Sequence, residues 1–135
     1  MIKYMNLIGI KARKASEYKV TTEVKNKVLN DYAKLIKNEK KFIINQNSKD
    51  INYARKSGLK ENLIKRLHLN ENKLNGIINS ILKIAKLRDP IDNTLDKWKR
   101  PNGLNIKRVS IPIGVIGVIY ESRPNVTSDV ASLCF

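Results

Sequence analysis

Residues 112–129 constrain the fold of this chain more than any other stretch. Within them, residues 114–119 read Gly-Val-Ile-Gly-Val-Ile, so apolar side chains fall on both faces of any strand formed there. A strand that is apolar on both faces is typical of a parallel sheet covered by helices. A polar loop and a helix start follow, and α/β proteins commonly bind ligands at that edge of the sheet. The sequence therefore predicts an α/β fold with a buried strand over residues 114–119.

The size and composition of the chain suit one globular domain. It has 135 residues, 41% hydrophobic and 29% charged, which argues against wholesale disorder. No apolar run approaches the roughly 18 residues that cross a bilayer, and the short apolar N-terminus lacks a signal-peptide cleavage site. With one cysteine, Cys134, and one histidine, His68, the chain offers neither a disulfide framework nor an ordinary zinc site. We expect a cytoplasmic protein without a membrane partner or a bound metal.

The formal net charge of +15 raises the question of a nucleic-acid partner. The basic residues are mostly lysines, which spread along the chain and alternate with isoleucine and asparagine. They form no long block and no stripe interleaved with aromatic residues, the usual patterns of nucleic-acid surfaces. We therefore do not expect specific nucleic-acid binding. The alternative hypothesis is a small basic helical module that binds nucleic acid or an acidic partner.

Helical periodicity runs through the chain up to Asp89-Pro90, where proline ends it. A helix is predicted over residues 2–17, and Thr21 is the predicted N-cap of a second. The second helix has the apolar stripe Val24, Val28, Tyr32, Leu35, Ile36 and Ile43. A short helical piece around Asp50–Lys56 ends at Ser57-Gly58, where Gly58 suits a left-handed C′ position, and another short helix holds Leu63, Ile64 and Leu67. Asn70 is the predicted cap of a last helix with the apolar face Leu74, Ile77, Ile78, Ile81, Ile84 and Ala85.

After Pro90 the pattern changes from helix to loop and strand. Residues 91–103 are polar and rich in turn formers, so we expect a loop there. Alternation over Asn105–Ile111 predicts an exposed or edge strand before the buried strand at residues 114–119. Thr127-Ser128-Asp129 predicts the start of a helix.

The strand and loop after residue 112 closely resemble one known family. Their sequence, Ile-Gly-Val-Ile-Gly-Val-Ile-Tyr-Glu-Ser-Arg-Pro-Asn-Val-Thr over residues 113–127, is similar to that of γ-glutamyl phosphate reductase, of the aldehyde dehydrogenase superfamily. The likeness covers essentially the whole chain. It includes Asn47, Asp50, Ala54, Gly58-Leu59, Arg66-Leu67, Asp89-Pro90, Pro101-Asn102-Gly103-Leu104, Asp129 and Ser132-Leu133-Cys134.

The resemblance implies NADPH-dependent reduction of γ-glutamyl phosphate to glutamate 5-semialdehyde and phosphate, in proline biosynthesis. A cysteine thiolate displaces phosphate to leave a thioester, which hydride from NADPH reduces. In the family that cysteine lies in a catalytic domain beyond residue 135, so we expect this chain alone to be inactive. The full-length enzymes are expected to be homo-oligomers.

The same resemblance assigns parts of a larger enzyme to this chain. Residues 1–104 correspond to the helical N-terminal part of the cofactor-binding domain. Residues 105–135 correspond to an oligomerisation-ribbon strand, the first strand of the cofactor sheet and the start of the following helix. A third possibility is a non-functional remnant that folds poorly alone.

Two residues after the predicted strand are the strongest site candidates. By resemblance, the amide of Asn125 is a possible donor to the oxyanion of the reaction. Its structural alternative is an Asx-turn or a helix cap. Arg123 suits a phosphate or carboxylate of the substrate, because its planar fork binds such groups bidentately. Its structural alternative is an ion pair with Glu121 or Asp129.

Other residues have weaker assignments. Tyr120, Glu121 and Ser122 are expected to line the cofactor loop, without individual roles. Cys134 lies among apolar residues, so we expect a buried structural thiol rather than the nucleophile. His68 is expected to be structural.

Overall fold

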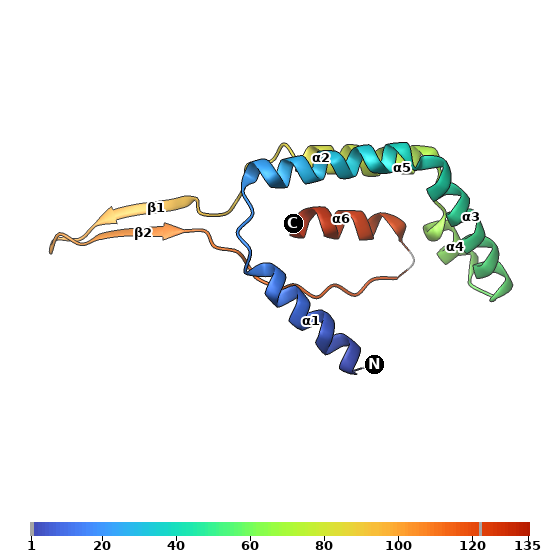
Figure 1. Ribbon diagram of the computed structural model, residues 1–135, viewed down its shortest axis with the longest axis horizontal. Helices are drawn as coiled ribbons and strands as arrows, with labels where there is room; N and C mark the ends of the chain where they lie inside the picture. Colours follow the sequence, from blue (N-terminus) through green and yellow to red (C-terminus); the bar gives the residue numbers. More distant parts are fainter. Residues whose placement is uncertain (1, 122) are drawn as a thin grey trace. The chain divides into compact units, whose positions relative to one another are not determined.

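The computed structural model describes residues 2–121 and 123–135, and these form two compact units. One unit runs to Lys19 and includes Arg88–Ile116, and the other combines Val20–Leu87 with Gly117–Phe135. The first contains helix α1 (Ile2–Ser16) and a hairpin, and the second contains the remaining helices (Figure 1). These two units are defined by contacts within this chain. The domain boundary expected at residue 104 belongs to a larger protein, and it stays a prediction.

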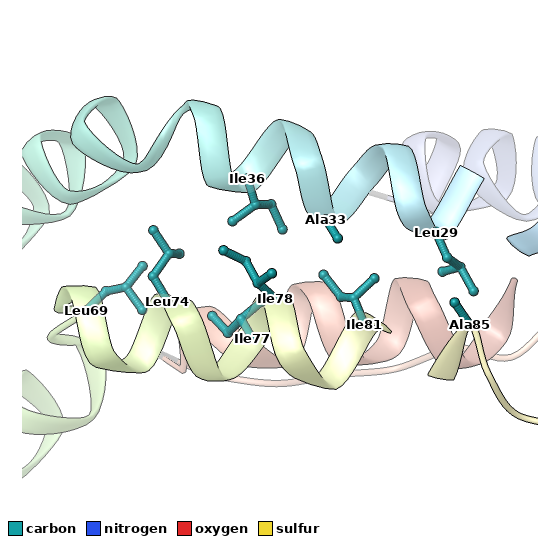
Figure 2. Close-up of a cluster of buried hydrophobic side chains, with 9 residues drawn as sticks. All are labelled: Leu29, Ala33, Ile36, Leu69, Leu74, Ile77, Ile78, Ile81 and Ala85. Carbon is teal, nitrogen blue, oxygen red and sulfur yellow. The ribbon is translucent and has the colours of Figure 1, made fainter. Parts of the chain in front are cut away.

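The second unit has five helices, α2 (Thr22–Asn38), α3 (Lys40–Lys56), α4 (Glu61–Leu67), α5 (Glu71–Ile84) and α6 (Pro124–Cys134). α2 and α5 lie side by side and bury the main core between them. Figure 2 shows the α2 side chains directed at those of α5; the cluster comprises Leu29, Ala33, Ile36, Leu69, Leu74, Ile77, Ile78, Ile81 and Ala85. Burial of each large aliphatic side chain stabilises the unit by about 1.5–3 kcal/mol.

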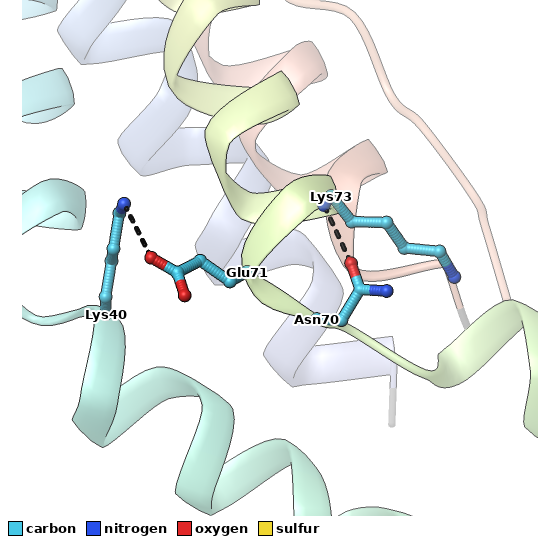
Figure 3. Close-up of polar contacts among 4 residues, drawn as sticks. All are labelled: Lys40, Asn70, Glu71 and Lys73. Atoms are coloured by element: carbon cyan, nitrogen blue, oxygen red, sulfur yellow. Dashed lines mark hydrogen bonds and ion pairs between the residues drawn. The ribbon is translucent and has the colours of Figure 1, made fainter.

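Hydrogen bonds at the helix ends agree with the sequence. The Thr21 hydroxyl accepts from the amide of Val24 at 3.4 Å, and Asn70 Oδ1 accepts from the amide of Lys73 at 2.9 Å. Figure 3 shows the Asn70 cap beside an ion pair of 3.5 Å between Lys40 Nζ and Glu71 Oε1. Both predicted N-caps are therefore confirmed.

Gly58 follows α3 with positive φ (+73°), as predicted, but α3 has 17 residues and is not the short piece expected around Asp50–Lys56. Its amide donates to the carbonyl of Arg55 at 3.1 Å, and the Leu59 amide donates to that of Ala54 at 3.0 Å. Leu59 then packs on a small second core of Ile51, Ala54 and Ile64. These are the two hydrogen bonds and the apolar contact of a Schellman motif.

The second predicted helix is wrong in its extent and in part of its stripe. Helix α2 ends at Asn38, and Glu39 separates it from α3. Ile43 therefore belongs to α3. Val24, Val28 and Leu35 are exposed. The buried face of α2 is Leu29, Ala33 and Ile36. Packing against α5 selects this face, and no glycine or proline marks the break.

The predicted loop over residues 91–103 is also wrong in part, because a strand lies within it. Strand β1 (Thr94–Lys99) pairs antiparallel with β2 (Asn105–Val109), with Trp98 opposite Ile106. The turn between them contains Gly103 at φ +88°, as its turn-forming sequence predicts. Strand β1 is exposed throughout, so it lacks the alternation that identifies a half-buried strand.

The buried strand expected at residues 114–119 is not formed in the described structure. Ile113 and Ile119 are 88% and 102% exposed, and Gly114 has φ +98°. A strand needs a neighbour to bind its backbone N–H and C=O groups, and no described segment pairs with this one. The helical layer, β2 and the helix after the loop are present, and α6 begins at Pro124, three residues before the predicted start.

Candidate functional site

An open groove in the helical unit collects the strongest site candidates. It has a volume of about 530 Å³, and its walls come from the end of α4, one side of α5 and the first turn of α6. Its lining residues are Lys65, Arg66, His68, Leu69, Lys73, Gly76, Ile77, Ser80, Arg123, Pro124, Asn125 and Asp129. Arg123 and Asn125, both predicted from the sequence, therefore line one groove.

Buried Asn47 of α3 fixes the wall that carries Arg66 and His68. Its Nδ2 donates to the carbonyl of Leu67 at 3.0 Å, and its Oδ1 accepts from the amide of Leu69 at 2.8 Å. A single side chain thus binds one carbonyl and one amide on either side of His68 in the turn between α4 and α5. The Lys73 ammonium donates to the carbonyl of His68 at 2.6 Å and to that of Lys65 at 3.4 Å, which tethers the same turn from α5.

Arg123 precedes α6 in extended backbone because a proline follows it. Pro124 then opens the helix, where its missing N–H costs no hydrogen bond. The Arg123 side chain is exposed, and among the described residues it makes no ion pair with Glu121 or Asp129. The ion-pair alternative for Arg123 is therefore not what the structure shows.

Asn125 lies in the first turn of α6, and its Nδ2 donates to Asp129 Oδ2 at 2.9 Å. This bond spans one helical turn and uses one of the two amide N–H groups. Burial, together with the charge of Asp129, raises the pKa of the Tyr32 phenol on α2. The Asp129 carboxylate thus interacts with both Asn125 and Tyr32.

The loop expected to line the cofactor is hydrogen-bonded to α6. The hydroxyls of Tyr120 and Thr127 lie 2.7 Å apart and share a hydrogen bond. Glu121 is exposed, and Ser122 lies outside the described residues. The assignment of this loop to a cofactor stays a prediction.

Cys134 and His68 are both exposed. Cys134 is exposed, so the prediction of a buried thiol is wrong for this structure; it lies near the end of α6 on a face that α5 does not cover. His68 is exposed in the groove wall, and its expected structural role stays a prediction. Sequence reasoning did not single out Lys65, Arg66 or Asn47 as site residues. The only signal for Arg66 and Asn47 was their place in the family resemblance.

In the part of the chain that the structure describes, no helix has the length and apolar content that crossing a membrane requires.

Both sequence and structure match one class of protein, oxidoreductases about three times as long as this chain. These are γ-glutamyl phosphate reductases, and this chain is homologous to their N-terminal part. The match covers nearly all of this chain but only 28% to 33% of the length of the curated relatives. No family model matches the chain.

Three matches illustrate the relationship. The γ-glutamyl phosphate reductase of Nautilia profundicola is 48% identical over 113 residues, which are 84% of this chain and 28% of that protein. The crystal structure of the Thermotoga maritima enzyme has a TM-score of 0.85 at 40% identity, covering 91% of this chain and 30% of that one. The Saccharomyces cerevisiae enzyme has a TM-score of 0.89 at 30% identity, covering 94% and 33%.

Proposed function

We propose that this chain forms the N-terminal part of a cytoplasmic, NADPH-dependent γ-glutamyl phosphate reductase of proline biosynthesis. The observation that carries the proposal is the agreement of sequence and fold over nearly all of the chain, at 40% identity and a TM-score of 0.85 to the Thermotoga maritima enzyme. In the reaction a thiolate expels phosphate from the acyl phosphate, and hydride from NADPH reduces the thioester formed. The hairpin β1–β2 is proposed to contribute to a homo-oligomer.

The groove fits the charge of the reactants. Both γ-glutamyl phosphate and NADPH carry phosphate groups, and the groove is lined by four cationic side chains and one carboxylate: Lys65, Arg66, Lys73, Arg123 and Asp129. Within the larger enzyme, Arg123 is proposed to bind the substrate. The Asn125 amide is proposed to donate to the oxyanion with the N–H group that Asp129 leaves free. Tyr120, Glu121 and Ser122 are proposed to border the cofactor.

A chimaera tests this function. This chain replaces the corresponding 30% of the Thermotoga maritima enzyme, which supplies the rest of the molecule. Activity is followed in reverse, as phosphate-dependent reduction of NADP⁺ by glutamate 5-semialdehyde, because acyl phosphates hydrolyse readily. We expect turnover by the chimaera and none by the Thermotoga maritima remainder alone.

The Asn125→Ala variant of the chimaera tests the oxyanion role. Removal of one oxyanion donor is expected to lower kcat about 10²–10³-fold with little change in KM. Asp129→Ala removes the same hydrogen bond from its other end and is the matched comparison. An equal loss of kcat in both variants would show that Asn125 acts only by holding α6.

A further inference from the structure

Three cations in the groove have neither an ion pair nor a hydrogen bond in the part of the chain that the structure describes. Lys65 and Arg66 end α4, and Arg123 precedes α6, so the two guanidinium groups come from segments far apart in sequence. In residues 2–121 and 123–135, none of the three side chains forms an ion pair or donates a hydrogen bond. Their charges are therefore available to a ligand.

The other two charged groups of the groove are already engaged. The ammonium of Lys73 binds the carbonyls of Lys65 and His68. The carboxylate of Asp129 accepts the hydrogen bond from Asn125. The groove thus keeps an excess of positive charge that its own residues do not neutralise.

A phosphate group is the ligand that this arrangement fits. Two arginines at one groove repel each other, and a bound dianion removes that repulsion. Each planar guanidinium can donate two parallel hydrogen bonds to phosphate oxygens. We propose that the groove is a phosphate site in which Arg66 and Arg123 hold one phosphate group between them. The two sources considered, the acyl phosphate substrate and the phosphorylated cofactor, rest on the function proposed above.

Gly76 gives the groove an open floor. It lies on α5 among the lining residues, and beyond its chain neighbours and the nearby backbone of its own helix, a Cβ added there would meet no atom within 4 Å. A larger side chain at this position therefore begins in free space and extends into the groove. Gly76→Leu is a steric test of the site that leaves every charge unchanged.

The first experiment titrates the ¹⁵N-labelled chain with inorganic phosphate at constant ionic strength. The amides of residues 65–69, 76–80 and 123–129 are expected to shift together. Arg66→Gln and Arg123→Gln are each expected to weaken binding about tenfold, the loss of one charge-assisted contact. Gly76→Leu is expected to weaken it as well, by occupying the groove.

Arg55→Gln is the matched control, since it removes an exposed arginine of α3 that does not line the groove. We expect less than about a twofold change in phosphate affinity, as for a distant screened charge. Equal weakening by Arg55→Gln and Arg66→Gln, or shifts scattered over the surface lysines, would mean general attraction to a basic protein and would overturn the proposal.

Kinetics of the chimaera identify the source of the phosphate and remain informative if the isolated chain is hard to study. If the substrate supplies it, Arg66→Gln raises the KM for inorganic phosphate about tenfold and leaves that for NADP⁺ unchanged. If the cofactor supplies it, the KM for NADP⁺ rises instead. An active chimaera in which neither KM changes would refute the phosphate site but not the reductase function. An inactive chimaera, together with phosphate binding by the isolated chain that depends on Arg66, would refute the reductase function but not the phosphate site.

Discussion

Asn47 is the polar residue on which the groove wall depends most. It is 6% exposed, and it binds the carbonyl of Leu67 and the amide of Leu69. Asn47→Ala leaves both backbone groups without a partner in a buried place, which is expected to lower the free energy of unfolding by about 3 kcal/mol. Urea unfolding followed by circular dichroism measures the change.

Asn30→Ala is the control for Asn47. Asn30 is exposed on α2, and its amide donates only to the carbonyl one turn earlier, Asn26, at 2.7 Å. Its replacement is expected to change stability by less than about 0.5 kcal/mol. A similar small change for Asn47→Ala would show that the turn between α4 and α5 holds without its side chain.

Alanine substitution at two glycines is predicted to change the stability of the helical unit in opposite directions. Gly58 has φ +73°, where a Cβ is strained, so Gly58→Ala is expected to destabilise the unit by about 1 kcal/mol. Gly76 lies inside α5 with open space at its Cβ position, so Gly76→Ala is expected to stabilise it by about 0.5–1 kcal/mol. Thermal unfolding of both variants measures whether each substitution lowers or raises stability. A loss of stability at Gly76 would mean that the groove floor tolerates no side chain.

At the scale of elements, α2 and α6 are linked through a titrating group. Burial and the Asp129 charge raise the pKa of Tyr32, so the folded unit favours the neutral phenol. The stability due to Tyr32 is therefore fully present below the ordinary phenol pKa of about 10 and is lost as pH rises through the higher folded value. Tyr32→Phe is expected to lose less stability above about pH 10 than the parent chain. Chemical unfolding at a series of alkaline pH values measures this difference.

Tyr53→Phe controls for that experiment, because Tyr53 is 74% exposed on α3. It should follow the parent chain at every pH. An identical alkaline loss of stability in the parent and in Tyr32→Phe would contradict the raised pKa of Tyr32.

Elements governed by local chemistry were predictable from the sequence, and those governed by pairing were not. The caps at Thr21 and Asn70 and the glycine at position 58 are signals that act within one helical turn. The break at Glu39 has no glycine or proline to signal it. Strand β1 pairs with its neighbour β2 across a short turn, but it is exposed throughout and so has no apolar alternation in sequence. The segment at residues 114–119 has the composition of a buried strand but no neighbour to pair with in the described structure.

At the scale of the molecule, the net charge of +15 is spread along the sequence, and four of the cationic side chains line one groove. Sequence resemblance identified Arg123 and Asn125 as candidates, and the structure places both in one groove. The resemblance did not predict that Lys65 and Arg66 lie in the same groove, because that proximity arises only when α4 packs on α3 and α6 packs on α5.

The central claim is that this chain serves as the N-terminal part of a γ-glutamyl phosphate reductase. The most direct measurement is kcat/KM of the chimaera with the Thermotoga maritima remainder, assayed as phosphate-dependent NADP⁺ reduction. We predict a value within about tenfold of the parent enzyme, a change in barrier of about 1.4 kcal/mol. A chimaera that folds, by circular dichroism and cooperative unfolding, yet shows no phosphate-dependent turnover would contradict the claim.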